Sequence, residues 1–316
     1  MLINKVHIEN YKSLVKLDII NPEPFCVFFG TNASGKSNIF EAIELLQLST
    51  FLGDKASTLF GNIDEMFSYT SGSKTSNFII NIETSLGSVE GRALEEDNFN
   101  SQVVNDTGIA NLLRNNTSRI FINHRSALPL KDDKRISSDA SNLDTVLKRI
   151  LDNGAIKEEF IEWMDLLIPE FYGIDFQLDE FTGENKMLVF EKHSNKPFSK
   201  NLISDGSINI FSIFTALYQT NDPQFLLIEE PEIGLNPKVV QQLAQLLREK
   251  CDENGTNIWV NTHSQTFVSE ITTKEAILVD KIEGKTKLKP LRDFDTFGLK
   301  VDQAWLSNMF DGGLPW

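Results

Sequence analysis

The chain has 316 residues, enough to bury a sizeable core as one large domain or as a domain with an inserted lobe. Apolar residues make up 41% and charged residues 24%, as in ordinary globular proteins, and the sequence shows neither an apolar run of membrane-spanning length nor a secretory signal at its start. The formal net charge of −15 disfavours nucleic acid as a partner, because binding to a phosphate backbone needs clustered lysine and arginine.

The first predicted elements are strands. Met1–Glu9 alternates apolar and polar residues, as a half-buried strand does, and Val15–Ile20 follows after the turn-like Asn10–Leu14. Asn21–Pro24 breaks this second strand. The short apolar run Phe25–Phe29 then has the composition of a buried strand.

A phosphate-binding pattern, Gly-x-x-x-x-Gly-Lys-Ser, begins at Gly30 and leads into a helix predicted from Ser37 to about Leu48. A strand, a glycine-bearing turn and a helix start bring backbone N–H groups and the helix dipole against a polyphosphate. Gly30 and Gly35 permit the close backbone approach, Lys36 supplies a cation to the β/γ-phosphates, and the Ser37 hydroxyl can ligate Mg²⁺. The chain is therefore predicted to bind a nucleoside triphosphate.

The middle of the chain is less regular. Strands are predicted at Phe78–Glu83, Ser88–Ala93 and Ser118–Asn123. Glu95–Thr107 is mostly polar, and we expect an exposed hairpin tip or loop there, while Pro129–Ser141 is predicted to be a charged loop. The nearest thing to a basic patch lies in that loop: Lys131, Lys134 and Arg135. We interpret it as a solvated loop in preference to a nucleic-acid contact.

Two helices and a hairpin come next. The helices are predicted at Asn142–Leu151 and Ile156–Leu167, and the hairpin pairs Phe171–Phe181 with Lys186–Glu191. We interpret about 105–200 as a lid or insert lobe laid on or inserted into an ATPase core. The sequence shows no internal repeat, coiled-coil heptad array or low-complexity tract.

Two strands in the last third end in polar residues that suit a nucleotide site. The apolar run Phe225–Ile228 leads into Glu229, a carboxylate placed to serve Mg²⁺ directly or through water. Glu230, the next carboxylate, is placed to polarise a water for in-line attack on the γ-phosphate. The apolar strand Asn257–Val260 precedes His263, which we interpret as a γ-phosphate sensor in preference to a structural histidine.

Two predicted helices flank the acidic strand, at Ile208–Tyr218 and Lys238–Lys250. Ser204, Asp205 and Gly206 precede the first and suit an ordinary helix start, with Ser or Asp as the N-cap and Gly for the turn. Ser204 has a second possible use. Its hydroxyl, the backbone amides and the helix start can also clamp the phosphates of a nucleotide held by a second subunit. The two cysteines, Cys26 and Cys251, are predicted to be packing residues in a reducing cytoplasm.

The motif order is phosphate loop, Ser-x-Gly helix start, Glu-Glu-Pro-Glu strand, Gly-Leu-Asn-Pro turn and Thr-His-Ser. This order resembles the ABC-type ATPases, specifically the RecF/SMC-like, OLD-like branch of the AAA family ATPases. The opening Ile8–Ser13 is similar to that branch's N-terminal strand motif, whose basic residue reaches the nucleotide. The resemblance implies an α/β fold: a single ABC-type P-loop ATPase head over residues 1–316, with a mixed sheet core, an antiparallel β subdomain and a small α+β lobe.

The resemblance also implies ATP and Mg²⁺ as cofactors, and a homodimer that sandwiches two nucleotides between one subunit's phosphate loop and the other's signature motif. Nucleotide contacts are implied for Lys12, Gly30, Asn32, Gly35, Lys36, Ser37 and Asn38. The signature and D-loop contacts are implied for Ser204, Gly206 and Asn236. The implied metal residues are Ser37 and Glu229, and the implied catalytic residues are Glu230 and the switch histidine His263.

The sequence departs from the family pattern in several places. The signature begins Ile-Ser-Asp-Gly instead of Leu-Ser-Gly-Gly, and Glu229 is one methylene longer than the usual aspartate at the metal position. The region after the first helix offers Asn62, Glu65 and Tyr69 but no clear Q-loop glutamine. His124 and Arg125 follow a predicted strand, and we interpret Arg125 as a partner in a structural salt bridge in preference to a phosphate contact.

These observations predict a Mg²⁺-dependent dimeric switch ATPase that controls a separately encoded effector, a nuclease or toxin, in bacterial anti-phage defence. About fifty residues follow His263, too few for an effector domain of its own. The alternative is a RecF/SMC-like ATPase in DNA repair or DNA-end recognition, which the acidity and the missing coiled coil disfavour. The ATPase subunit of a membrane transporter is disfavoured by the N-terminal motif and the missing Q-loop, and no membrane association is expected.

Overall fold

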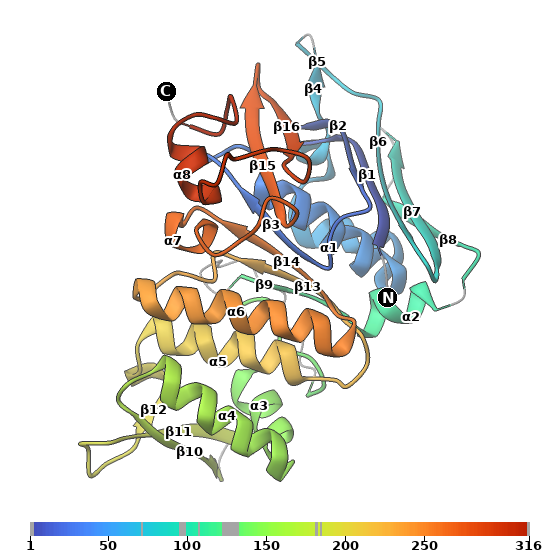
Figure 1. Ribbon diagram of the computed structural model, residues 1–316. Helices are drawn as coiled ribbons and strands as arrows, with labels where there is room; N and C mark the ends of the chain where they lie inside the picture. Colours follow the sequence, from blue (N-terminus) through green and yellow to red (C-terminus); the bar gives the residue numbers. More distant parts are fainter. Residues whose placement is uncertain are drawn as a thin grey trace.

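The computed structural model describes residues 3–70, 72–94, 99–106, 108–121, 133–180, 183 and 185–314. These residues form a mixed sheet and an antiparallel sheet that enclose one long helix, with further helices and a small sheet on the other side of the mixed sheet (Figure 1). The predicted α/β head, with its mixed core and antiparallel subdomain, is confirmed by this arrangement.

The mixed sheet is the centre of the molecule, with strand order β16-β15-β3-β14-β13-β9. In that order its strands are β16 (Lys285–Pro290), β15 (Ala276–Ile282), β3 (Phe25–Phe29), β14 (Asn257–Thr262), β13 (Phe225–Glu229) and β9 (Thr117–Ile120). Its strands run parallel except for β16, which pairs antiparallel with β15 at the edge. Because β3, β13 and β14 are parallel, their carboxyl ends meet at one edge of the sheet.

The antiparallel sheet has the order β2-β1-β6-β7-β8. Its strands are β2 (Leu14–Ile20), β1 (Ile3–Tyr11), β6 (Asn77–Thr84), β7 (Gly87–Leu94) and β8 (Asn100–Val104). Glu95–Thr107 is expected to be an exposed hairpin tip or loop, and the loop alternative is wrong for part of its described length, because Asn100–Val104 forms β8 and pairs antiparallel with β7. Phe99 is fully buried and stacks on Phe78 with ring centroids 5.3 Å apart, and this aromatic contact anchors the polar strand that follows it.

Helix α1 (Lys36–Leu52) lies between the two sheets and is a turn longer than predicted. It is apolar almost all round, as expected of a helix buried on several sides. Alternation along β3 divides the core: Cys26 and Phe28 face α1, whereas Phe25, Val27 and Phe29 face the helices on the opposite side.

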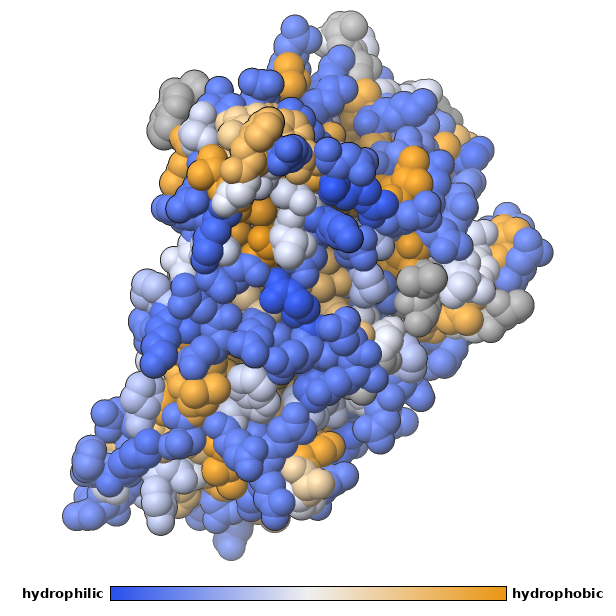
Figure 2. All heavy atoms as spheres, in the orientation of Figure 1, coloured by the Kyte–Doolittle hydropathy of each residue, from blue (hydrophilic) through white to orange (hydrophobic). Residues whose placement is uncertain are grey.

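The opposite side of the mixed sheet carries the later helices, α5 (Asp205–Tyr218), α6 (Pro237–Asn254), α7 (Gln265–Val268) and α8 (Val301–Leu306). The C-terminal segment packs back on the core, because Trp305 meets the ring of Phe29 edge-on and donates its indole N–H to the Gly313 carbonyl at 3.0 Å. Hydrophilic residues cover α6 on the face seen in Figure 2, where hydrophobic side chains gather only in small separate patches. Within the described residues, no helix combines the length and apolarity needed to cross a bilayer.

A small α+β unit lies against α5, at the bottom of Figure 1. It consists of α3 (Leu143–Leu151), α4 (Gly154–Leu167), β10 (Phe171–Leu178), β11 (Asn185–Glu191), β12 (Phe198–Ser199) and the 3₁₀ turn η3 (Lys200–Leu202). The preceding residues differ: α2 (Ile109–Asn115) packs on α1, and β9 belongs to the mixed sheet. We therefore propose that the lobe starts after β9, later than the expected residue 105.

The remaining short elements lie between α1 and β6. They are the 3₁₀ turns η1 (Gly53–Phe60) and η2 (Ile63–Met66) and the strands β4 (Tyr69–Thr70) and β5 (Ser73–Lys74). Of the predicted basic segment, Lys131 lies outside the described residues, whereas Lys134 and Arg135 lie within them. His124 and Arg125 also lie outside the described residues. Of that segment, Arg135 donates to the Arg114 carbonyl, an intramolecular contact.

Candidate nucleotide and magnesium site

The phosphate loop connects β3 to α1 and turns on two glycines. Gly30 has φ +145° and Gly35 has φ +102°, which are angles that residues with a side chain rarely adopt. A Cβ at Gly30 would lie 2.0 Å from the Val279 carbonyl oxygen, and one at Gly35 would lie 2.0 Å from Thr286 Oγ1. The loop therefore needs glycine at both positions, for its backbone conformation and for lack of space. The motif predicted the two glycines but not the neighbours that crowd them.

A hydrogen-bond network of Thr286, Ser13 and Asn38 supports this loop. Thr286 Oγ1, on β16, donates to the Ser34 carbonyl at 2.7 Å and lies 2.7 Å from Ser13 Oγ. Asn38 Nδ2 donates to Ser13 Oγ at 2.9 Å, so this predicted nucleotide contact is engaged with the loop's support. Thr286 carried no signal in the sequence, because its role depends on β16 lying beside the loop. Ser13 stood in the N-terminal motif.

Lys36 is buried over the concave side of the loop. Its ammonium donates to the carbonyls of Gly30 at 3.1 Å and Thr31 at 2.7 Å. Burial lowers the pKa of Lys36 to about 8. The nearby carboxylates, above all Glu230, act in the opposite direction and raise it. The lysine cation is thus held at the mouth of the loop, where the motif requires it for phosphate.

Glu229 ends β13 and is fixed at both oxygens. Oε2 accepts from Ser37 Oγ at 2.6 Å and from Asn261 Nδ2 at 3.0 Å, whereas Oε1 accepts from Arg119 Nε at 2.7 Å. The Glu229 side chain is 1% exposed, while Ser37 is exposed at the start of α1. Sequence reasoning identified Glu229 and Ser37 but missed Arg119 and Asn261, which lie on neighbouring strands and belong to no motif.

These residues fit Mg²⁺. The Ser37 hydroxyl donates a hydrogen bond to Glu229 and keeps oxygen lone pairs for a cation, in reach of a carboxylate. Mg²⁺ keeps several waters and is usually held by one or two protein groups together with substrate phosphates. Among the described residues no group of three or more His, Cys, Asp or Glu side chains is placed to hold a metal by itself.

Glu230 and His263 face each other beyond this carboxylate. Glu230 has φ +48°, an uncommon angle for a residue with a side chain, and its N–H donates to the Asn261 carbonyl at 2.7 Å. Its Oε1 lies 3.7 Å from His263 Nε2, and His263 Nδ1 lies 3.1 Å from the Gly30 carbonyl oxygen. Burial, with Glu232 and Glu229 nearby, raises the pKa of Glu230, which makes it a stronger base.

The surroundings of His263 favour the neutral form of its ring. Burial and the neighbouring Lys36 cation lower the pKa of His263. Its loop is anchored by Glu232, whose Oε1 accepts from Thr262 Oγ1 at 2.6 Å and from the backbone N–H groups of His263 and Ser264 at 3.1 Å each. Glu232 was missed as a site residue, although it is the last acid of the Glu-Glu-Pro-Glu motif. It joins the ends of β13 and β14 into one unit.

The signature and D-loop residues start two helices. Ser204 is the N-cap of α5 and accepts from the Ser207 N–H at 3.1 Å, and Asn236 is the N-cap of α6 and accepts from the Val239 N–H at 3.1 Å. A Cβ at Gly206 would lie 2.4 Å from the Gly234 carbonyl oxygen, so the two turns pack closely. Of the two N-cap candidates, Ser204 and Asp205, Ser204 is the one that caps α5, and the nucleotide contacts of these residues remain predictions.

Two further predicted nucleotide contacts lie at the edge of the site. Asn32 is exposed in the phosphate loop. Lys12 follows β1 with φ +47° and forms an ion pair with Glu41 on α1, which also accepts from the Tyr11 hydroxyl at 2.5 Å. The ion pair places Lys12 against α1, the helix that follows the phosphate loop. A contact between Lys12 and the nucleotide remains a prediction.

Comparison with known families decides the classification. A family model described as "AAA domain, putative AbiEii toxin, Type IV TA system" matches residues 67–269, and a model described as "AAA ATPase domain" matches residues 1–86. The chain belongs to the first of these families. Membership makes it an ATPase of AAA/ABC type, and the predicted RecF/SMC-like, ABC-type resemblance is confirmed.

Solved structures of SMC head domains share this ATPase-family fold. An Smc head bound to the C-winged helix domain of ScpA has a TM-score of 0.68 at 17% identity, covering 91% of this chain and 96% of that chain. An Smc head with a coiled coil and joint from Pyrococcus yayanosii has a TM-score of 0.67 at 11% identity, covering 98% and 99%. The SMC head from Thermotoga maritima has a TM-score of 0.54 at 15% identity, covering 92% and 99%. At these identities the similarity establishes the fold alone.

Curated relatives of this AAA/ABC-type chain match over shorter segments. The phosphonates import ATP-binding protein PhnC 1 of Rhodopseudomonas palustris (strain HaA2) is 38% identical over 73 residues, 22% of this chain and 25% of the relative. The methionine import ATP-binding protein MetN of Lactococcus lactis subsp. cremoris (strain SK11) is 33% identical over 76 residues, 24% of this chain and 20% of the relative. The chain thus spans a quarter or less of the length of these two relatives.

Proposed function

We propose that this chain is a Mg²⁺-dependent dimeric switch ATPase that binds and hydrolyses ATP and controls a separately encoded effector in bacterial anti-phage defence. One observation carries the proposal: Ser37 of the phosphate loop is hydrogen-bonded to Glu229 of the acidic strand at 2.6 Å. This bond brings the residue that follows the phosphate-loop lysine next to the carboxylate proposed to serve the metal.

The proposed chemistry uses the chain's own groups in fixed roles. Lys36 and the loop N–H groups bind the β- and γ-phosphates, and Ser37 with Glu229 holds the metal, which neutralises phosphate charge when bound. Glu230 accepts a proton from the attacking water, helped by its raised pKa. His263, kept neutral and anchored by its loop, contacts the γ-phosphate from the side of the Gly30 carbonyl.

The remaining predicted contacts complete a dimeric site. In the proposal, Ser204 and Gly206 bind the phosphates of a nucleotide held by the second subunit, where the start of α5 supplies backbone N–H groups. Asn236 begins α6 at the same interface. Lys12, Asn32 and Asn38 border the subunit's own nucleotide.

The proposed biological role rests on the family description and on charge. The matching family model is named for a toxin of a type IV toxin–antitoxin system, which favours a defence setting with a toxic or nucleolytic effector. The net charge of −15 favours a protein partner with a basic surface over a nucleic acid. The effector is proposed to be a separately encoded protein.

Steady-state ATP hydrolysis with and without Mg²⁺ tests this function. We expect E230Q to lower the rate about 10²–10⁴-fold, as loss of a general base does, while ATP binding is retained. We expect K36A to lose ATP binding, since it removes the cation that meets the phosphates. Equal rates in wild type, E230Q and K36A would remove both residues from the mechanism and refute the proposal.

A second candidate function, an ATPase in DNA repair or DNA-end recognition, is favoured by the SMC-head fold. Salt titration of DNA binding separates the two functions. Contacts with phosphates release counterions, so genuine DNA binding weakens steeply as salt rises. Binding of DNA ends that depends on ATP and falls steeply with salt would replace the defence proposal with this one.

A further inference from the structure

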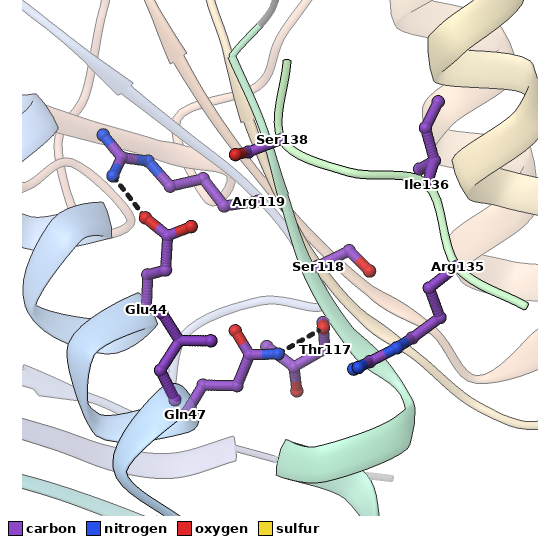
Figure 3. Close-up of a pocket in the computed structure, with 9 residues that line it drawn as sticks. Glu44, Gln47, Thr117, Ser118, Arg119, Arg135, Ile136 and Ser138 are labelled. Carbon is purple, nitrogen blue, oxygen red and sulfur yellow. Dashed lines mark hydrogen bonds and ion pairs between the residues drawn. The ribbon is translucent and has the colours of Figure 1, made fainter. Parts of the chain in front are cut away.

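Arg119 lies at the end of β9 between two carboxylates from different elements. Its Nη1 donates to Oε2 of Glu44, on α1, at 2.6 Å, and its Nε donates to Oε1 of Glu229, on β13, at 2.7 Å. The side chains of Arg119 and Glu44 are 9% and 13% exposed, and that of Glu229 is 1% exposed. Figure 3 shows Arg119 and Glu44 pointing toward each other across the gap between β9 and α1.

The three side chains depend on one another. A charge taken out of water is retained only when it is paired and hydrogen-bonded, and removal of one partner leaves the other uncompensated. The planar guanidinium presents its donors in a fixed fork, so Arg119 can hold both carboxylates at set positions. A cavity of about 30 Å³, lined in part by Glu44 and Arg119, has room for water beside this pair (Figure 3).

The two carboxylate oxygens of Glu229 are held by different partners. Arg119 occupies Oε1, and Asn261 together with Ser37 occupies Oε2. A glutamate has one more rotatable bond than the aspartate usual at this position, so its carboxylate needs more restraint to keep one orientation. The side chains of Arg119 and Asn261 come from the strands on either side of β13 and supply that restraint.

We propose that Arg119, anchored by Glu44, is a positioning residue for Mg²⁺: it holds Oε1 of Glu229 so that Oε2 stays on the Ser37 hydroxyl. The proposal rests on the proposed function of this site and adds residues that lie outside its motifs. Arg119 acts through Glu229 and contacts neither metal nor nucleotide. Partners of this kind orient a metal site, and their loss typically costs 10–100-fold in metal affinity.

Binding of a non-hydrolysable ATP analogue, measured by calorimetry over a MgCl₂ series and in EDTA, tests the proposal. We expect R119M to raise the Mg²⁺ concentration of half-maximal enhancement about tenfold, while affinity in EDTA changes less than twofold. R119K keeps the charge but loses the fork, so its shift is expected to be smaller. E44Q keeps an acceptor for Arg119 but loses the charge assistance, and a shift of about threefold is expected.

The matched control is R248M, which removes an arginine paired with Glu275 at 2.6 Å and 3.1 Å on the other side of the mixed sheet. We expect its Mg²⁺ dependence to equal that of the wild type. Thermal unfolding of each variant identifies loss of folding, and E44Q and R119K decide the question if R119M does not fold.

Three results would contradict the proposal. Equal loss of affinity with and without Mg²⁺ would make Arg119 a purely structural residue, and a tighter Mg²⁺ response in R119M would make it a competing cation. An unchanged Mg²⁺ response in R119M, R119K and E44Q would exclude any role at the metal. A wild type that binds the analogue with no Mg²⁺ enhancement would overturn the proposed function itself, which is a distinct outcome.

Discussion

The two halves of the proposed nucleotide site are built in different ways. The phosphate-loop half is held by contacts between distant parts of the chain, such as Thr286 on Ser34 and Arg119 on Glu229. The signature half is held near its tips by local capping, with Ser204 and Asn236 each accepting from an N–H three residues ahead. Tertiary contacts hold the first half in place, whereas the second half consists of two capped helix starts whose turns pack on each other at Gly206 and Gly234.

This difference predicts where substitutions act. A change in the braced half disturbs several elements together and should affect both stability and ligand binding. A change in the capped half should remove only the stability that the N-cap hydrogen bond provides, together with any contact that the residue makes in a dimer.

Gly35→Ala tests the braced half most severely. The new Cβ would lie 2.0 Å from Thr286 Oγ1 and 2.7 Å from Ser13 Oγ at φ +102°, so both the backbone and the hydroxyl network have to move. We expect a loss of more than about 3 kcal/mol in unfolding free energy and loss of measurable ATP binding. Gly284→Ala is a control, because it removes a positive-φ glycine, at φ +78°, with no neighbour within 4 Å of the new Cβ. Similar losses in the two variants would show that the bracing adds nothing beyond backbone strain.

Lys36 gives this half a pH dependence. Its folded pKa is about 8, below the ordinary 10.5, so between these values the unfolded chain binds more protons than the folded chain. Stability therefore rises as the pH rises from about 8 to about 10.5, by up to about 3 kcal/mol. Chemical denaturation of nucleotide-free wild type and K36M over this range measures the difference, in which the other titrating groups cancel. A difference that is flat with pH, or that falls, would contradict the buried position of Lys36.

Local sequence patterns predicted the parts of the fold that depend on neighbours along the chain. The phosphate loop, the strands Phe25–Phe29 and Asn257–Val260 and the helix start at Ser204 follow from composition and periodicity over a few residues. The N-terminal strand pair was also predictable from alternation.

Contacts between distant segments were not predictable in this way. Phe99 gave no strand signal, because its burial depends on Phe78 of another strand. Arg119 was part of a strand prediction, but only the side-by-side order of β9 and β13 brings it to Glu229. Thr286 supports the phosphate loop although it follows it by some 250 residues. A single sequence specifies such pairings only through the completed fold.

Ser204→Ala gives the smallest effect and tests the capped half. Loss of an N-cap side chain typically costs about 1 kcal/mol, so only a modest drop in stability is expected. Asn153→Ala is the matched control, since Asn153 caps α4 in the lobe by accepting from the Ala155 N–H at 3.1 Å. Both variants should lose similar stability in denaturant titrations and should bind ATP like the wild type. Only S204A should lower the hydrolysis rate, and the deficit should persist at saturating ATP, because the proposed contact forms when a second subunit closes on the bound nucleotide. Equal hydrolysis in S204A and N153A would leave Ser204 a helix cap and nothing more, and the signature half would then have no part in the chemistry through this hydroxyl.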